Sequence, residues 1–469
     1  MYAPDTDPPG STRYPENGIP RARSSSSRAA RRLDVDSPDT EDSSSVREVL
    51  TRGDSNGRRT DHCPRPAEIL LSSPFAPHDP TSPGSHHVNR RLGRALAGVS
   101  AAVASAVLLA ACGSSSTSST PAGNGGHSAD PKTATSAADL GGLDALVKAA
   151  QKEGQLNVIA LPRNWANYGE ILDAFAKKYG IMIDSANPDG SSQDEINAVK
   201  SLKGQTRGPD VLDLGNAFAL TAATSGLLAP YKVQTWSKIP DSLKEADGKW
   251  YGDYGGYVSI GCNSAVVNPC PASFADLTKP AYKGKVALNG DPTKAGAAFA
   301  AVYAAALANG GSFDNIQPGI DFFGTLKKSG NFIPVGVTSA TITKNETPIA
   351  VNWDYLNAAV VSQVPTWTTA VPTDGLYANY YDQAISAYAP HPAAARLWEE
   401  YLYSAEGQNL FLKGLARPVE LTAMTADQTV DAALLAKLPK VDSAVQLPSN
   451  AQLDAAKQAV ANGWAKATS

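Results

Sequence analysis

The sequence predicts an α/β protein, and three observations support this fold class. Apolar segments of strand length alternate with amphipathic helical segments in a β-α-β-α-β order between residues 156 and 215. This order requires right-handed crossovers and a mostly parallel sheet. The 358 residues from Cys112 to Ser469 are enough for two α/β lobes, each with its own core. Apart from an apolar stretch that ends before Cys112, no segment is apolar enough to span a membrane.

The first lobe is expected to begin near Leu140, with a helix whose apolar residues recur at helical spacing and which Gly154 can cap. A second helix is expected to begin at Ser191 or Ser192, because a serine N-cap followed by Glu195 satisfies the free N–H groups of a first turn. The other elements expected here are a strand at 156–161, a helix at 168–180, and strands at 181–183 and 209–215.

The second half of the chain continues the pattern with an aromatic, glycine-rich strand and a very alanine-rich helix. The expected elements are a helix at 216–226, strands at 250–264, 286–288 and 348–352, helices at 296–309 and within 314–331, two helices broken near Ser404, and a final helix at 452–467.

An export signal precedes Cys112. Arg90, Arg91 and Arg94 form a positive region, an apolar stretch runs from Ala95 to Ala111, and small residues stand directly before Cys112. This pattern resembles the bacterial lipobox, and the resemblance implies a diacylglyceryl group on Cys112. A Ser/Thr-rich stretch follows, as a flexible tether requires.

Residues 1–87 differ in composition from the rest of the chain. Residues 1–111 contain fourteen Arg and no Lys, whereas the remainder contains four Arg and twenty-three Lys. This composition predicts that residues 1–87 are disordered. Because an export signal normally begins a protein, we also expect these residues not to be translated in the cell. A genuine disordered cytoplasmic arm is the alternative.

Charge and histidine content restrict the function. From Cys112 onward the chain has 27 basic and 32 acidic residues, so no basic surface for nucleic acid is expected. This part contains only His127 and His391, and it lacks the G-x-S-x-G and H-E-x-x-H patterns of common hydrolases. We therefore expect no enzyme, no metal and no cofactor, with a secreted hydrolase as a minor alternative.

Cys262 and Cys270 are the two remaining cysteines of the exported part, in the segment GCNSAVVNPCP. Two cysteines close together in an exported chain predict a disulfide that closes a short loop. A metal site is less favoured, because no histidine lies within a hundred residues of them.

A resemblance to a known family covers most of residues 142–420. The segments GPDVLDLGNAFALTAATSGLLAPY, PASFADLTKPAYKGKVALNGDPTKAG and HPAAARLWEEYLYSAEGQNLFLKGL, in this order, resemble the type II periplasmic binding proteins of ABC importers. The branch is the one that carries ferric iron, polyamines, thiamine and phosphonates. The resemblance implies two lobes with mixed, mostly parallel sheets joined by a hinge, which close over a small solute and deliver it to a permease.

The resemblance also implies a domain organisation and a location. The expected divisions are the preface 1–87, a signal peptide at 88–111, a linker at 112–138, lobe 1 at 139–256, lobe 2 at 257–376, and C-terminal helices at 377–469 that return to the lobes. We expect a monomer held by its lipid on the outer face of the membrane or in the periplasm. A ligand sensor on the same fold is a further alternative.

The loops after the strands are expected to carry the site, because ligands bind beyond the carboxyl ends of strands in open α/β sheets. The candidate ligand contacts are Asn164, Trp165, Tyr168, Ser191, Ser192, Asp213, Asn216, Tyr254, Tyr257, Gly296, Trp353, Asp354 and Tyr355. Asp354 between two aromatic residues is the sharpest candidate, because a carboxylate with aromatic neighbours can hold an ammonium group.

Three ligand classes remain open. A polyamine or other cationic amine ranks first, because carboxylates and aromatic rings are both available. A phosphonate or other anion could use the backbone N–H groups at Ser191 and Ser192. Ferric iron is disfavoured, since iron-binding relatives carry an adjacent tyrosine pair where this chain has Asp354-Tyr355, and Tyr380-Tyr381 falls later. Thiamine or a sugar completes the set.

Overall fold

The computed structural model describes residues 129–441 and 445–469. The predicted signal peptide, the lipidation site Cys112 and the preface 1–87 lie outside these residues, as does most of the linker. The lobe boundaries given above stay predictions. Within the described residues, no helix is both long enough and apolar enough to cross a membrane.

Lobe 1 is formed by the early elements of the chain together with α9 to α12. Gly154 ends α1 with φ 74°, as the sequence predicts, and Ser191 caps α3 by accepting the N–H of Asp194. The early elements are α1 (Leu143–Glu153), β1 (Gln155–Ile159), α2 (Tyr168–Tyr179), β2 (Met182–Ala186), α3 (Ser192–Ser201), β3 (Val211–Gly215), α4 (Asn216–Thr224) and β4 (Leu228–Ala229).

Lobe 2 contains the middle of the chain and is completed by α13. The alanine-rich α5 is buried around nearly its whole circumference, which explains why almost every position in it is small or apolar. The elements are β6 (Val286–Leu288), α5 (Gly296–Ala308), α6 (Gln317–Ser329), α7 (Ser339–Thr343), β7 (Ile349–Trp353), α8 (Asp354–Ala359) and β8 (Trp367–Ala370).

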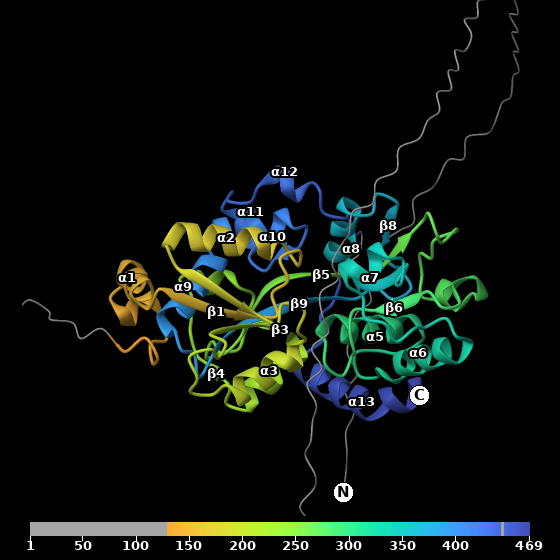
Figure 1. The fold of residues 1–469 in the computed structure, drawn as a ribbon, viewed down its shortest axis with the longest axis horizontal. Coiled ribbons are helices and arrows are strands. Elements are labelled where there is room, and N and C mark those ends of the chain that lie inside the picture. The colour runs from red at the N-terminus through yellow and green to blue at the C-terminus, as the bar shows by residue number, and fades with distance from the viewer. Residues whose placement is uncertain (1–128, 442–444) are drawn as a thin grey trace, which may run out of the picture. The chain divides into compact units, whose positions relative to one another are not determined.

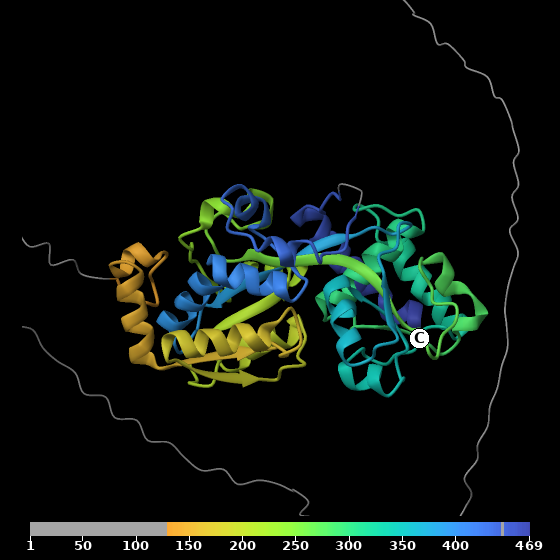
Figure 2. The same cartoon turned by 90° about the horizontal axis from the view of Figure 1, so that it is seen from above.

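Two long strands, β5 (Tyr251–Asn263) and β9 (Ala378–Ser386), connect the lobes. Figure 1 shows both strands crossing the middle of the molecule, and Figure 2 shows β5 running from one lobe into the other. In lobe 1 the start of β5 pairs with β9, and in lobe 2 its end pairs with β7 and β8. This is the geometry of a two-stranded hinge.

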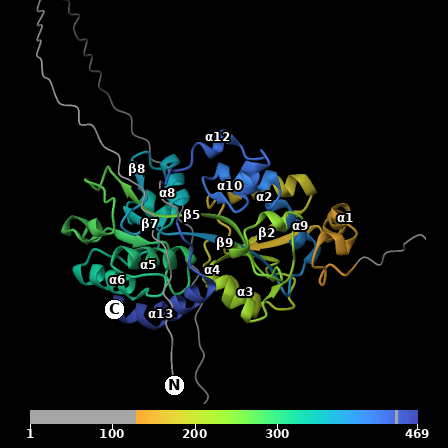
Figure 3. The same cartoon turned by 180° about the vertical axis from the view of Figure 1, so that it is seen from behind.

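After β9 the chain returns to lobe 1 and then crosses once more. The return elements are α9 (Pro392–Leu402), α10 (Ala405–Lys413), β10 (Arg417–Pro418), α11 (Leu421–Ala426) and α12 (Ala432–Leu435). The final helix, α13 (Asn450–Thr468), lies along α6, and Figure 3 shows it beneath lobe 2 and extending toward α4. Short 3₁₀ turns occupy Ala137–Leu140, Trp236–Lys238, Asp241–Leu243, Ala275–Thr278, Pro280–Tyr282 and Val360–Ser362.

The two-lobe α/β fold is confirmed, but the sheets are less parallel than expected. β1 pairs in parallel with β2, and β6 with β7. The other pairings, which involve β5 or β9, are antiparallel. The reason is that β9 runs against β3 in lobe 1 and β5 runs against β7 in lobe 2, and the sequence pattern did not reveal β9.

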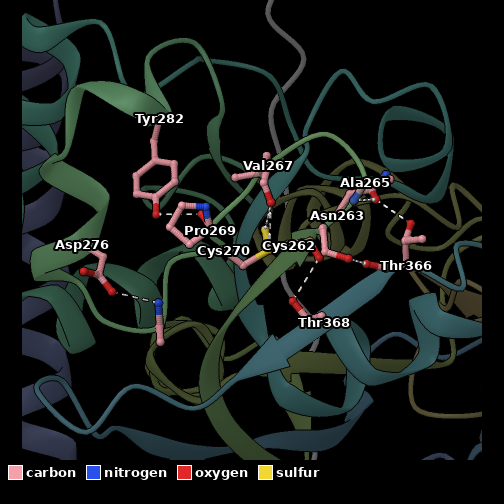
Figure 4. Close-up of a disulfide and its surroundings, with 12 residues drawn as sticks. Cys262, Asn263, Ala265, Val267, Pro269, Cys270, Asp276, Tyr282, Thr366 and Thr368 are labelled. Carbon is pink, nitrogen blue, oxygen red and sulfur yellow. Dashed lines mark hydrogen bonds between the residues drawn. A yellow bond between two sulfur atoms is a disulfide. The ribbon is translucent and has the colours of Figure 1, made fainter.

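The predicted disulfide between Cys262 and Cys270 is present, with their Cα atoms 5.9 Å apart. It closes a loop at the lobe 2 end of β5, and Figure 4 shows the Tyr282 hydroxyl beside this loop, where it donates a 3.0 Å hydrogen bond to the carbonyl of Pro269. The disulfide therefore fixes the end of a hinge strand within lobe 2.

Candidate functional site

A cavity of about 640 Å³ lies between the two lobes. Lobe 1 contributes the loop after β1, the loop before α3 and the end of β3. Lobe 2 contributes the loop after β6, the start of α5 and the region of α7 and α8. These are the carboxyl ends of strands and the starts of helices, where ligands of α/β proteins bind.

Asp213, near the end of β3, lines the lobe 1 side of this cleft. Its Oδ2 accepts a 2.6 Å hydrogen bond from the Tyr254 hydroxyl, which in turn accepts one of 2.7 Å from the Trp165 indole N–H. Its Oδ1 is buried and has no hydrogen-bond partner among the described residues. A buried carboxylate oxygen without a partner is costly. Among the described residues that have such a partnerless buried atom, Asp213 is the one that lines the cleft, so it is the first candidate for a ligand contact.

A second carboxylate, Glu195 on α3, also lines the cleft and accepts the backbone N–H of Asp213 at 2.9 Å. Burial raises the pKa of Asp213 to about 7. Burial and the neighbouring Asp213 charge raise the pKa of Glu195 well above its usual range. Each carboxyl therefore resists ionisation, and a bound cation would favour ionisation.

Aromatic rings surround Asp213. The Trp165 ring lies edge-on to Tyr381 at 5.5 Å and to Tyr355 at 6.4 Å between centroids. Tyr254 stacks on Tyr381 at 5.7 Å. Trp165 and Tyr381 line the cleft, whereas Tyr254 and Tyr355 are buried behind them. Ring faces beside a carboxylate are suited to an organic cation.

The lobe 2 side of the cleft is polar without charge. Its described lining residues include Asn289, Thr338, Ser339, Asn352 and Gln363, and none of those from lobe 2 is charged.

The acidic residues of the lining all come from lobe 1. The lining also contains a single basic residue, Arg163, but its guanidinium pairs with the exposed Asp173 at 2.5 Å. The cleft is therefore acidic on one side and neutral on the other.

The two lobes touch beside the cavity. A Cβ added to Gly215 would lie 2.8 Å from the Cα of Gly296, so both positions must remain glycine for this approach. The backbone N–H of Gln193 donates to the carbonyl of Lys294 at 3.1 Å, and the Asn164 amide donates to the Ser339 hydroxyl at 2.5 Å. The lobes are therefore in direct contact across the cleft.

The structure brings some of the sequence candidates together in the cleft and leaves others outside it. Those that line it are Asn164, Trp165, Ser191, Ser192, Asp213 and Gly296. Ser191 caps α3, and the Ser192 hydroxyl accepts the N–H of Gly215 at 3.1 Å, so both also have structural partners. Outside the lining are Tyr168, Asn216, Tyr254, Tyr257, Trp353, Asp354 and Tyr355.

Asp354 is the main correction. It is fully buried, and its carboxylate accepts a 2.7 Å bond from Arg417 and the backbone N–H groups of Tyr257 and Tyr355 at 3.0 Å each. The Arg417 guanidinium also lies 4.4 Å from the centre of the Tyr257 ring. The negative charge of Asp354 is thus already paired within the hinge region, so the expected contact with an ammonium ligand does not fit this structure.

The other candidates outside the lining are buried for separate reasons. The Asn216 amide donates to Asp382, the Tyr168 hydroxyl to Asp253, and Trp353 packs 6.4 Å from Tyr355 between ring centroids.

Residues that the sequence reasoning missed include Glu195 and Tyr381. Tyr381 stands out in the sequence only as part of the Tyr380-Tyr381 pair.

Within the described residues, no group of three or more His, Cys, Asp or Glu side chains could hold a metal ion.

Comparisons with known proteins agree with this architecture. A family described as bacterial extracellular solute-binding proteins matches residues 207–443. No curated protein sequence matches the chain. Among solved structures, the periplasmic binding protein AfuA from Actinobacillus pleuropneumoniae, with fructose-6-phosphate bound, aligns with a TM-score of 0.55 at 19% identity over 67% of this chain and 99% of its own.

Two further structures share the fold. The periplasmic binding protein P5PA aligns with a TM-score of 0.54 at 20% identity, over 67% of this chain and 100% of its own. The ferric binding protein from Campylobacter jejuni aligns with a TM-score of 0.51 at 17% identity, over 66% of this chain and 99% of its own. At these identities the likeness establishes the two-lobe fold alone.

Proposed function

Because the chain belongs to the family of bacterial extracellular solute-binding proteins, we propose that it captures a cationic amine between its lobes and hands it to the permease of an ABC importer. The observation that carries the choice of ligand is the partnerless Oδ1 of Asp213 in a cleft lined by Trp165 and Tyr381. An ammonium group there would satisfy the carboxylate and contact the ring faces at the same time.

The charge distribution supports an amine over an anion. Among the described lining residues, Asp189, Glu195 and Asp213 of lobe 1 are acidic, and the one basic residue, Arg163, is paired with Asp173. A bound cation would favour ionisation of the buried Glu195 and Asp213, whereas an anion would oppose it and would depend on backbone N–H groups at helix starts. At the start of α3 such groups already have partners: the Ser191 N–H donates to the Asp194 carboxylate, the Asp194 N–H to the Ser191 hydroxyl, and the Gln193 N–H to the Lys294 carbonyl.

An anion remains a second candidate because of α5. Its N-cap, Ala295, has no side chain that can cap the free N–H groups, and both Ala295 and Gly296 line the cleft. The AfuA structure holds a sugar phosphate on the same fold. A phosphonate or sugar phosphate at this helix start is therefore the alternative to test directly.

A thermal-shift screen of the full chain separates these candidates. Polyamines and choline-type amines are the first compounds, with phosphonates, sugar phosphates, thiamine and Fe(III) beside them. A ligand that binds the folded protein raises the melting temperature by mass action. We expect amines to raise it. A rise with an anion or iron, and none with any amine, would reject the proposed ligand class.

Cys112 is proposed to carry the lipid that holds the protein at the outer face of the membrane. The support is the resemblance of residues 109–113 to a lipobox after an apolar stretch. Mass spectrometry of the protein taken from cells should find that Cys112 is the first residue and that it carries a diacylglyceryl group. Cys112→Ala should release the protein from the membrane. A peptide from residues 1–87 in the precursor would reject the proposal that this preface is not translated.

The protein is further proposed to act as a monomer that binds without catalysis. Among the described residues that line the cleft there is no histidine, and His391 lies in lobe 1 with its Nδ1 2.8 Å from Asp210. Light scattering of the purified chain would test the monomer, and recovery of unchanged amine after release from the protein would test the absence of chemistry.

A further inference from the structure

The C-terminal helix α13 contacts both lobes, although it belongs mainly to lobe 2. Trp464 packs between Phe323 and Phe332 of lobe 2, with ring centroids 5.6 and 5.9 Å away. At the start of the helix, the Gln452 side chain donates to Asp314 at 2.8 Å. These contacts hold α13 to lobe 2 at both of its ends.

Gly324 of α6 allows α13 to pack closely against α6. A Cβ at Gly324 would lie 2.9 Å from the carbonyl oxygen of Ala467, so a larger residue would push the two helices apart. Apolar, close-packed contacts of this kind do not slide easily. When the lobes move, α13 is therefore expected to move with lobe 2.

α13 also packs against α4 of lobe 1, and Lys457 makes directional interactions within this contact. Its ammonium donates to the Thr221 hydroxyl at 2.6 Å and to the Ala217 carbonyl at 3.2 Å, both on α4. It also lies 4.1 Å from the centre of the Phe218 ring. One charged side chain thus makes three directional contacts with a helix of the other lobe.

Opening of the cleft would break these contacts. α4 begins at Asn216, directly after the Gly215 that touches Gly296 of lobe 2, so α4 moves away from lobe 2 when the lobes separate. Hydrogen bonds from a charged donor weaken steeply with distance, so those of Lys457 break when α4 moves away. The apolar packing of α13 against α6 lies within lobe 2 and is unaffected.

We propose that Lys457 is a positioning residue that latches lobe 2 to α4 and shifts the protein toward its closed conformation from outside the ligand cleft. The latch acts on the hinge equilibrium, so it does not depend on which solute the cleft takes. A residue that stabilises only the closed state raises the apparent affinity for any ligand that needs closure.

Interlobe distances measured by pulsed electron paramagnetic resonance on the ligand-free full chain test the latch. Cys63→Ser and Cys112→Ser prevent labelling at these two positions of the recombinant full chain. Nitroxides are attached at Lys177→Cys on α2 and Lys328→Cys on α6, both exposed. We expect Lys457→Ala to shift the distance distribution toward open forms, with a change of roughly tenfold in the open-to-closed ratio.

Matched variants separate the latch from a general loss of structure. Lys466→Ala removes an exposed lysine from the same helix and is expected to leave the distribution unchanged, and Lys457→Arg is expected to restore most of the closed form. An unchanged distribution in Lys457→Ala overturns the proposal, including the case in which only its melting temperature falls.

Thr221→Val tests the same latch from the lobe 1 side, in a protein whose α13 is intact. It is expected to shift the distribution in the same direction as Lys457→Ala but less far, because the Ala217 carbonyl remains. The double variant is expected to match Lys457→Ala alone. Two independent shifts that add in the double variant would contradict a direct contact between these residues as the cause.

Discussion

The Tyr254 hydroxyl donates a 2.6 Å hydrogen bond to Oδ2 of Asp213, while Oδ1 of the same carboxylate has no partner among the described residues. The bond orients the carboxylate and satisfies only half of it. A buried carboxylate oxygen without a partner costs stability, and a ligand that donates a hydrogen bond to Oδ1 would recover this cost.

Asp213→Asn is therefore expected to stabilise the ligand-free protein at pH 8. Burial raises the pKa of Asp213 from 3.8 to about 7, so the folded protein binds this proton more tightly than the unfolded chain does. Its favourable contribution is complete below pH 3.8 and is lost as the pH rises through about 7. Chemical denaturation should show a gain on the order of 1–4 kcal/mol at pH 8 and little gain at pH 4. A loss of stability at pH 8 would mean that the carboxylate is already satisfied without ligand.

Amine affinity is expected to increase with pH. An ammonium ligand requires ionised Asp213, whereas burial raises the pKa of this carboxyl to about 7 and so favours its protonated form below that pH. Calorimetric titration with the amine that gives the largest thermal shift should show tighter binding at pH 8 than at pH 5.5, by up to about tenfold per pH unit below 7. Tighter binding at the lower pH would point to a ligand that binds the protonated carboxyl instead.

Asp354→Ala is expected to damage the fold instead of removing a ligand contact. It would leave the Arg417 guanidinium, which is largely buried, without its 2.7 Å carboxylate partner. Removal of one member of a buried pair typically costs about 3–5 kcal/mol. Urea denaturation measures this loss, and Asp173→Ala, which breaks an exposed pair with Arg163, is the matched control and should cost less than about 1 kcal/mol. Equal effects from the two variants would contradict the assignment.

Loss of the disulfide is expected to lower stability without removing the cleft. Cys262 and Cys270 are eight positions apart, and closing so short a loop restricts the unfolded chain by about 2–3 kcal/mol. Cys262→Ala combined with Cys270→Ala should lower the free energy of unfolding by this amount. The amine affinity of the double variant should remain within about threefold, because neither cysteine lines the cleft.

Local signals in the sequence predicted much of the fold. Gly154 and Gly180 end α1 and α2 in the left-handed conformation, and Ser404 separates α9 from α10 as an N-cap. The strand β9 had no such signal. Its residues ANYYDQAIS alternate poorly, because its polar residues Asp382 and Gln383 are buried among partners from distant parts of the chain.

The site was only partly predictable for the same reason. The loops after β1, β2 and β3 converge as strand order requires, and Trp165, Ser191, Ser192 and Asp213 meet in the cleft. The misjudged Asp354 depends on Arg417, which lies 63 positions later and reaches it from β10. A buried pairing between distant residues leaves no trace in local composition, so an isolated carboxylate between aromatic residues looked like a ligand contact.

The most direct test of the amine-binding account is the affinity of wild-type protein and Asp213→Asn for the amine that gives the largest thermal shift. The two side chains have nearly the same size, and only the carboxylate can form a charge-assisted bond, so calorimetry should show a loss of roughly tenfold or more. The same affinity in both proteins, or tighter binding of a phosphonate than of any amine, would contradict the account.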